Sequence, residues 1–410
     1  MYMSIQQGFS RLLLAAAALL ALSLICAGPA LAQFGSIRTS EEDDKTIRVN
    51  GEVDAYIEYI STNFKGDYSG DTRGDGAWSG AFGNGLADSY SNVQTRLREA
   101  EIHFRRTTTV SEGSEWRLHN EIELEFKPRT HDRDGQRFDL EEASATLFKN
   151  GGGMYFQIGF LEDKKLYEGG NTDESTSEDA KGFDENPSIR FGYYTGELDV
   201  DLRYASIIQR NDEVFEADLD GDSEADFTGR KDIVETQIRL QAEWKRKEFA
   251  EVLFSYTLVS SANKEDDRFQ SSVAALEAAN ADTAAYEDAG LLSSTVIGLG
   301  GVMFFGDIWP SLTYESRHIE ENKGDEGYDV SVIEAGVTVA NLGPGNLWIA
   351  AELGNSDLSG EDVAFTQFSG EYHFKAGRSK YGPGFKSFSN DAPGEKLSGL
   401  IVYFGGEYVF

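Results

Sequence analysis

The sequence predicts an all-β fold, a 16-stranded antiparallel transmembrane β-barrel with short periplasmic turns and long external loops. Three observations support this fold class. Apolar and polar residues alternate within segments of about ten residues. The connections between these segments alternate between short and long, and the chain ends on an apolar segment with the same alternation. After the N-terminal region, no apolar run reaches the roughly 18 residues that a transmembrane helix needs.

The segment 116–126, "WRLHNEIELEF", shows the alternation most clearly. Successive side chains of a strand point to opposite faces, so one face carries the apolar residues Trp116, Leu118, Ile122, Leu124 and Phe126. The opposite face carries Arg117, His119, Glu121, Glu123 and Glu125. The same pattern recurs at 46–59, 99–105, 153–160, 198–204, 237–244 and 346–354. Such strands have one face suited to lipid and one suited to water.

The connections indicate how these strands are joined. Short ones lie at 111–115, 150–153, 195–197, 245–248, 305–307 and 342–345, and long polar ones lie near 61–94, 127–138, 161–188, 209–232, 260–293, 319–327 and 354–362. Short turns on one side and long loops on the other are the arrangement of outer-membrane barrels. The count of segments is 16, and the weakest is 377–388, which contains Gly and Pro. An even count returns the last strand to the side where the first begins.

The last segment, "GLIVYFGGEYVF", places Leu400, Val402, Phe404, Tyr408 and Phe410 on one face of a strand. A closed barrel leaves no unpaired edge in lipid, so this last strand must pair with the first. The ending resembles that of outer-membrane porins generally, and the resemblance implies that Phe410 is a signal read by the barrel-assembly machinery. The competing interpretation is a soluble β-sandwich that ends on Phe by chance.

The N-terminal region predicts export. Arg11 precedes the apolar run "LLLAAAALLALSLICA", and the small-x-small pattern of a cleavage site follows at 30–32. We therefore expect a signal peptide over 1–32, an N-terminal periplasmic segment over 33–46 and the barrel over 47–410, in the outer membrane of a Gram-negative bacterium. An uncleaved membrane anchor is the alternative. Lipidation at Cys26 is not expected, because Ile25 stands where a lipoprotein signal needs a small residue.

The composition narrows the choice of partners. The chain has 37 Lys and Arg against 71 Asp and Glu, a formal net charge of −34, so it repels nucleic acid and attracts cations. A solvated acidic surface explains this charge as well as a specific ligand does. Cys26 is the only cysteine, and it lies in the expected signal peptide, so no disulfide, thiolate metal site or cysteine nucleophile is expected. The lipid bilayer and lipopolysaccharide are the expected surroundings.

One long connection departs from the β pattern. Within residues 269–292, Phe269, Val273, Leu276 and Asn280 follow helical spacing in an Ala-rich stretch. A short helix on an external loop is therefore predicted.

Two stretches carry a more specific resemblance. "TRLREAEIHFRRTTTVSEGSEWRLHNEIELEF" and "DLEEASATLFKNGGGMYFQIGFLEDKKLYEGGNTDESTS", together about residues 93–178, resemble the phosphate-selective porin O/P family. The resemblance implies a homotrimeric, 16-stranded diffusion pore whose third long loop folds inward. The sequence departs from the family in its charge, since anion-selective members line their pores with Arg and Lys whereas these strands carry mostly acids.

If the apolar face meets lipid, the other face lines the pore. The residues with pore-lining parity are Glu52, Asp54, Glu58, Glu99, Glu101, Glu121, Glu123, Glu125, Asp199, Asp201 and Glu243, with Arg48, Arg105, Arg117, Arg190, Arg203, Arg239, His103 and His119. Because acids outnumber arginines in this set, a modest preference for cations is expected. The alternative is an anion- or phosphate-selective pore, with the arginines at the narrowest point.

Two loops are candidate sites. The third long loop supplies a candidate constriction with Asp173, Glu174, Glu178, Asp179, Asp184 and Glu185, although the same loop is also compatible with an external, solvated position. "DLDGDSEAD" places Asp218, Asp220, Asp222, Glu224 and Asp226 at alternate positions. This spacing makes a weak calcium candidate, because an EF-hand loop has Gly at its sixth position and Glu at its twelfth, and this stretch does not. No other cofactor is expected.

Enzymatic activity is not expected. The five histidines stand in no HExxH motif and the chain has no G-x-S-x-G motif. A receptor barrel of about 22 strands with a plug would need a longer chain. The sequence therefore predicts a porin, a passive channel for small hydrophilic solutes and ions. A structural or adhesion barrel that uses its long acidic loops is the remaining alternative.

Overall fold

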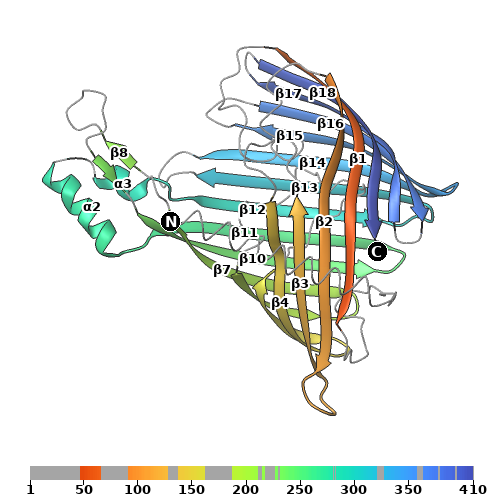
Figure 1. The fold of residues 1–410 in the computed structure, drawn as a ribbon, viewed down its shortest axis with the longest axis horizontal. Helices are drawn as coiled ribbons and strands as arrows, with labels where there is room; N and C mark the ends of the chain where they lie inside the picture. Colours follow the sequence, from red (N-terminus) through yellow and green to blue (C-terminus); the bar gives the residue numbers. More distant parts are fainter. Residues whose placement is uncertain are drawn as a thin grey trace. The chain divides into compact units, whose positions relative to one another are not determined.

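The computed structural model (Figure 1) describes residues 47–65, 91–127, 137–161, 187–210, 215–217, 227–229, 231–279, 281, 283–320, 327–357, 363–376, 379–392 and 395–409. The expected signal peptide, the segment 33–46 and Phe410 lie outside these residues.

The described chain is almost entirely β-structure. The strands are β1 Arg48–Lys65, β2 Ser91–Thr109, β3 Trp116–Lys127, β4 Arg137–Lys149, β5 Gly153–Phe160, β6 Pro187–Tyr194, β7 Leu198–Arg210, β8 Phe215–Ala217, β9 Phe227–Gly229, β10 Asp232–Arg246, β11 Ala250–Asn263, β12 Ser293–Met303, β13 Ile308–Glu320, β14 Tyr328–Leu342, β15 Gly345–Ser356, β16 Val363–Ala376, β17 Ser379–Ala392 and β18 Glu395–Val409. The helices are α2 Asp267–Ala278 and α3 Thr283–Asp288. Among the described residues no helix has the length and hydropathy needed to cross a bilayer.

Sixteen of these strands form one closed antiparallel barrel in chain order, which confirms the predicted fold (Figure 1). The last strand β18 pairs with β1 from Glu52↔Val409 to Lys65↔Lys396, so the sheet has no free edge. The segment predicted as the weakest strand corresponds to β17, which pairs with β16 and β18. The remaining two strands, β8 and β9, form a separate hairpin between β7 and β10, which the sequence did not predict.

The two faces of the barrel wall differ in polarity. In β18, Leu400, Val402, Phe404 and Tyr408 are exposed, whereas Ile401 and Tyr403 are buried. The predicted parity of the last strand is therefore confirmed. Exposed apolar side chains recur around the barrel, in β7, β10 and β12 for example, while most buried polar and charged side chains lie at the alternate positions. The outer surface is thus apolar and the inner surface is largely polar.

One part of the inner face is apolar, contrary to the simple alternation. Tyr56, Tyr328, Val330, Val332, Phe365, Phe388, Ile401 and Tyr403, from β1, β14 and β16–β18, pack into one buried cluster. Several of its rings cover a glycine on the adjacent strand: Tyr56 covers Gly405, Tyr403 covers Gly384 and Phe388 covers Gly399. A side chain at these glycines would occupy the space of the ring. The glycines of β17 and β18 therefore accommodate aromatic rings in the wall.

The two helices form a small insert between β11 and β12. Phe269 and Leu276 of α2 are buried, and the Phe269 ring stacks on Tyr286 of α3 with centroids 5.8 Å apart. The Asp266 side chain accepts hydrogen bonds from the backbone N–H groups of Phe269 and Arg268, both 3.1 Å long, and thereby caps α2. Both bonds lower the pKa of Asp266, and the bond from Phe269 has the larger effect. The predicted helix is confirmed as α2, whereas α3 was not predicted.

Lys231, just before β10, attaches this insert to the barrel. Its side chain is fully buried. The ammonium donates hydrogen bonds to the backbone carbonyls of Tyr286, at 2.5 Å, and of Glu287, at 2.7 Å, and it lies 5.1 Å from the centre of the Tyr286 ring. Burial lowers the pKa of Lys231 to about 8, although Asp288 and Glu287 partly oppose the change.

We expect the docking of α2 and α3 to strengthen as the pH rises from 8 toward 10.5. In that interval Lys231 binds fewer protons when buried than when released, because its pKa is lowered only in the docked state. The gain is on the order of 3 kcal/mol at most. Hydrogen exchange of residues 267–288, corrected for the chemical exchange rate at each pH, measures it. Lys231→Ala should lower protection at every pH and remove the pH dependence, whereas Lys247→Ala, at an exposed position in the turn between β10 and β11, should do neither. An unchanged pH profile in Lys231→Ala would contradict this role.

Candidate functional site

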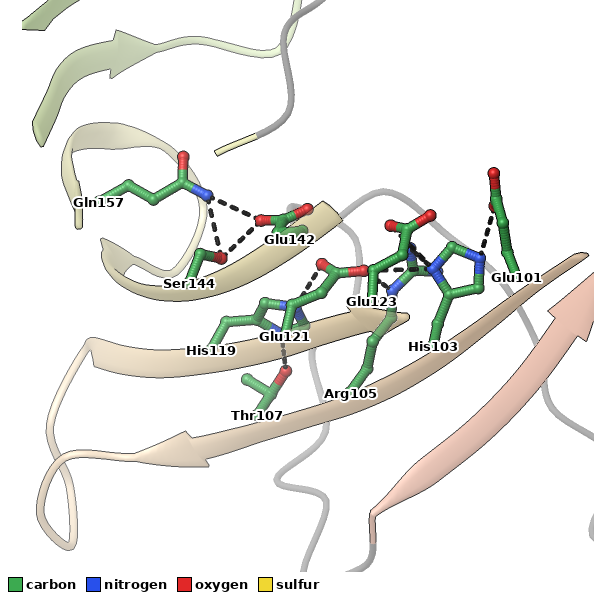
Figure 2. A network of polar contacts seen from close by, with 10 residues as sticks. All are labelled: Glu101, His103, Arg105, Thr107, His119, Glu121, Glu123, Glu142, Ser144 and Gln157. Carbon is green, nitrogen blue, oxygen red and sulfur yellow. Dashed lines mark hydrogen bonds and ion pairs between the residues drawn. The ribbon is translucent and has the colours of Figure 1, made fainter. Parts of the chain in front are cut away.

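The inner face of β2 and β3 carries a dense group of ionisable side chains. Alternate residues of β2 from Glu101 to Thr107 lie beside alternate residues of β3 in antiparallel register. The directly opposed pairs are Glu101↔Glu125, His103↔Glu123, Arg105↔Glu121 and Thr107↔His119. Cross-strand partners project from the same face and lie close enough for their side chains to interact. Figure 2 shows these side chains, apart from that of Glu125.

His103 is at the centre of this group. Its Nε2 lies 3.3 Å from the Glu101 carboxylate, and its Nδ1 lies 3.1 Å from the Glu123 carboxylate and 4.0 Å from that of Glu121. Arg105 forms an ion pair with Glu121, and its Nη2 is 3.3 Å from His103 Nδ1. The imidazole therefore stands between carboxylates on both of its sides.

The group extends along β3 into β4 and β5 (Figure 2). His119 contacts Thr107 Oγ1 through Nδ1, at 2.9 Å, and Glu121 through Nε2, at 3.3 Å. Ser144 donates to Glu142 at 2.6 Å, and Gln157 Nε2 donates to the same carboxylate at 3.4 Å. Hydroxyl, imidazole and carboxylate in one chain can activate a nucleophile, but Thr107, His119 and Glu121 are all buried, and Arg105 is paired with the carboxylate. The arrangement is better suited to holding the His119 ring in one orientation than to activating a nucleophile.

A second charged group follows on β6, β7 and β10. Arg190 is directly opposite Arg203, and Arg203 is directly opposite Arg239, so three arginines form one row across adjacent strands. Arg203 donates to Ser188 at 2.8 Å and Arg239 donates to Thr257 at 2.9 Å. Acids accompany the row, since Arg190 Nε lies 3.6 Å from Asp201. Tyr155 donates to Asp199 at 3.1 Å, which ties the acidic positions to β5.

The structure locates most of the residues predicted to line a pore. His103, His119, Glu121, Glu123, Asp199, Asp201, Arg203 and Arg239 are buried on the barrel strands, and Glu101, Arg105 and Arg117 are half-buried there. The side chain of Glu99 lies outside the described residues. So do the candidate constriction residues Asp173, Glu174, Glu178, Asp179, Asp184 and Glu185, and the candidate calcium residues Asp218, Asp220, Asp222, Glu224 and Asp226.

Sequence reasoning missed several members of these groups, among them Glu142, Ser144 and Gln157. Two acids are adjacent at 141–142, and the β3–β4 register shifts between Glu123/Leu124, so that Glu123 pairs with Glu142 and Leu124 with Leu140. A β-bulge of this kind changes which residue faces inward. Alternation alone could not choose between the two glutamates.

No protein-family model matches this sequence, and no curated protein matches it. Solved structures match its fold. The outer membrane channel DcaP of Acinetobacter baumannii is similar with a TM-score of 0.55 at 12% identity, over 92% of this chain and 100% of the other. An anion-selective porin from Comamonas acidovorans has a TM-score of 0.51 at 11% identity, over 88% of this chain and 99% of the other. Outer-membrane expressed OmpT of Vibrio cholerae has a TM-score of 0.51 at 10% identity, over 90% and 100%. At such identities the likeness concerns the fold.

Proposed function

We propose that this protein is an outer-membrane porin of a Gram-negative bacterium, a passive channel for small hydrophilic solutes and ions with a modest preference for cations. The observation that carries the proposal is the closed 16-stranded wall, which is apolar outside and carries rows of charged side chains inside. Such a wall satisfies its backbone in lipid and offers a polar passage. The likeness in fold to outer-membrane channels supports it. No covalent chemistry is part of this function.

The cation preference follows from the balance of charge on the inner wall. Among the described buried side chains on the barrel strands, twelve are Asp or Glu and five are Lys or Arg. Fixed charges of one sign raise the local concentration of counter-ions and so favour their passage. The preference is modest, since salt screens charges over about 8 Å at physiological ionic strength.

A specific observation favours an anion-selective pore as the second candidate. The row Arg190, Arg203 and Arg239 concentrates three positive charges at one level of three strands. If the passage is narrowest there, this local charge outweighs the general acidic excess. The resemblance of residues 93–178 to a phosphate-selective family and the fold of the anion-selective porin agree with this alternative.

A reversal potential across a KCl gradient in a planar bilayer distinguishes the two candidates. We expect potassium to be more permeant than chloride, with a selectivity that falls as the salt concentration rises. In Asp199→Asn/Asp201→Asn the preference for potassium should fall, because two wall carboxylates are lost. A chloride-selective wild-type channel would refute the cation preference and support the arginine row. Absence of any conductance from folded barrel would refute the channel itself and leave a structural or adhesion barrel.

The proposal includes surroundings that the resemblance to porins implies. The exposed apolar face would contact lipid and lipopolysaccharide, the chain would assemble as a homotrimer, and the barrel-assembly machinery would insert it. The described part of β18 supplies an apolar outer face up to Tyr408 for that insertion.

A further inference from the structure

Among the described residues, the carboxylates of Glu101, Glu121 and Glu123 all lie within 4.0 Å of the His103 ring nitrogens. Glu121 and Glu123 are almost fully buried, and Glu125 and Glu142 are buried on either side of them. Burial of ionised carboxylates is costly unless positive charge is close. Ligand atoms of His103, Glu121 and Glu123 all lie within 4.8 Å of one another, as metal ligands do.

A hydrogen bond from His103 Nε2 to a carboxylate would leave Nδ1 as the nitrogen that binds a metal. Its Nε2 lies 3.3 Å from the Glu101 carboxylate. When Nε2 donates its proton there, the Nδ1 lone pair points to the side of Glu121 and Glu123. A carboxylate behind a histidine in this way orients the ring and makes it a better ligand.

Asn50 of β1 adds an independent observation. It is directly opposite His103 in the β1–β2 register, so both side chains project from the same face. Asn50 is only 5% exposed, and its side-chain oxygen has no hydrogen-bond partner. A buried amide oxygen without a partner destabilises the fold, because it has lost its hydrogen bonds to water and gained none in return. A cation beside His103 would satisfy it.

The guanidinium of Arg105 occupies the corresponding cation position. It pairs with Glu121, and its Nη2 is 3.3 Å from His103 Nδ1, so it contacts two of the groups that a metal would bind. The Arg105 side chain is 28% exposed, unlike its buried partners, and can therefore turn away from them. Arg105 and a metal would be alternative occupants.

We propose that His103 Nδ1, Glu121 and Glu123 bind a divalent first-row transition cation of the zinc type inside the barrel, with the Asn50 side-chain oxygen as a fourth donor and Arg105 displaced. The imidazole favours such a cation over calcium or magnesium, which prefer oxygen ligands alone. The site does not depend on whether the barrel conducts.

Calorimetric titration of the chelator-treated, folded barrel in detergent with ZnCl2 tests the proposal. We expect one saturable site, and at least a tenfold weaker affinity in His103→Ala and in the shape-conserving Glu123→Gln. The matched control is His373→Ala, because His373 is also a buried barrel histidine, 2.9 Å from Glu371, and its loss should leave the affinity unchanged. Circular dichroism and heat-modifiable mobility show whether each variant is folded.

Arg105→Gln separates a metal site from an ordinary ion-pair network. Removal of the competing guanidinium should raise zinc affinity at least fivefold, and X-ray absorption should show one nitrogen ligand with oxygen ligands. If folded wild-type barrel binds no zinc stoichiometrically, if His103→Ala binds as well as wild type, or if Arg105→Gln binds more weakly, the proposal is wrong. An oxygen-only shell would also overturn it, since it would indicate scattered binding to surface acids.

Discussion

Leu202→Arg is expected to lower the free energy of unfolding of the barrel in lipid by about 2–4 kcal/mol. Leu202 is 47% exposed on the outer face of β7, between Phe191 of β6 and Leu240 of β10, which are exposed as well. In lipid these three side chains would lie in hydrocarbon. A guanidinium there loses its hydration and finds no ion-pair partner among such neighbours, which is why the expected cost is large.

Denaturant unfolding of the barrel in lipid vesicles measures this cost. Val110→Arg is the matched control, because Val110 is similarly exposed but lies in the short turn between β2 and β3, where water is available. It should change stability by less than about 0.5 kcal/mol. Equal penalties at the two positions would mean that the apolar outer face is not what the lipid contacts.

The barrel could be predicted because lipid imposes the same requirement on every strand. One face must be apolar, so alternation alone assigned the described outward residues of β18, and the count of alternating segments predicted the strand number. Alternation fails where the apolar face of a strand turns inward. In β14, Tyr328, Val330 and Val332 alternate with the polar residues Asp329 and Ser331, so the pattern would place the three apolar residues outside, but they are buried and Asp329 is exposed. Their position depends on rings and aliphatic groups from β16, β17, β18 and β1, which are remote in sequence.

In the candidate sites, the sequence predicted which face of a strand each side chain occupies, but the neighbours of that side chain depend on how the strands are aligned. Parity indicated that His103, Glu123 and Arg203 share the polar face, but it could not indicate which of them meet. The opposition of His103 to Glu123 and the arginine row depend on strand register, and the pairing of Arg203 with Arg239 spans a connection of more than ten residues. Lys231 is a further case, because its partners Tyr286 and Glu287 follow it by more than fifty residues. Contacts between residues so far apart in sequence can be identified only from the folded structure.

Gly406→Val is expected to prevent the barrel from closing. Gly406 has a φ of +148°, a conformation that side chains other than glycine rarely adopt. A Cβ at this position would lie 2.2 Å from the Lys380 carbonyl oxygen and 2.7 Å from Tyr381 Cα of β17. The strained backbone alone costs on the order of 1–3 kcal/mol. Separation of β17 from β18 would also break ladder hydrogen bonds worth about 1 kcal/mol each.

The measurement is the fraction of chain that runs as a compact, heat-modifiable and SDS-resistant band after refolding in detergent. Gly406→Val should lose most of this band, because β18 must pair with β17 and β1 at once. Gly196→Val is the matched control, since Gly196 lies in the turn before β7 and no atom lies within 4 Å of the added Cβ. That variant should refold as the wild type does. Normal refolding of Gly406→Val would show that the closing strands can shift register without loss, which would contradict the close approach of β17 and β18 at this glycine.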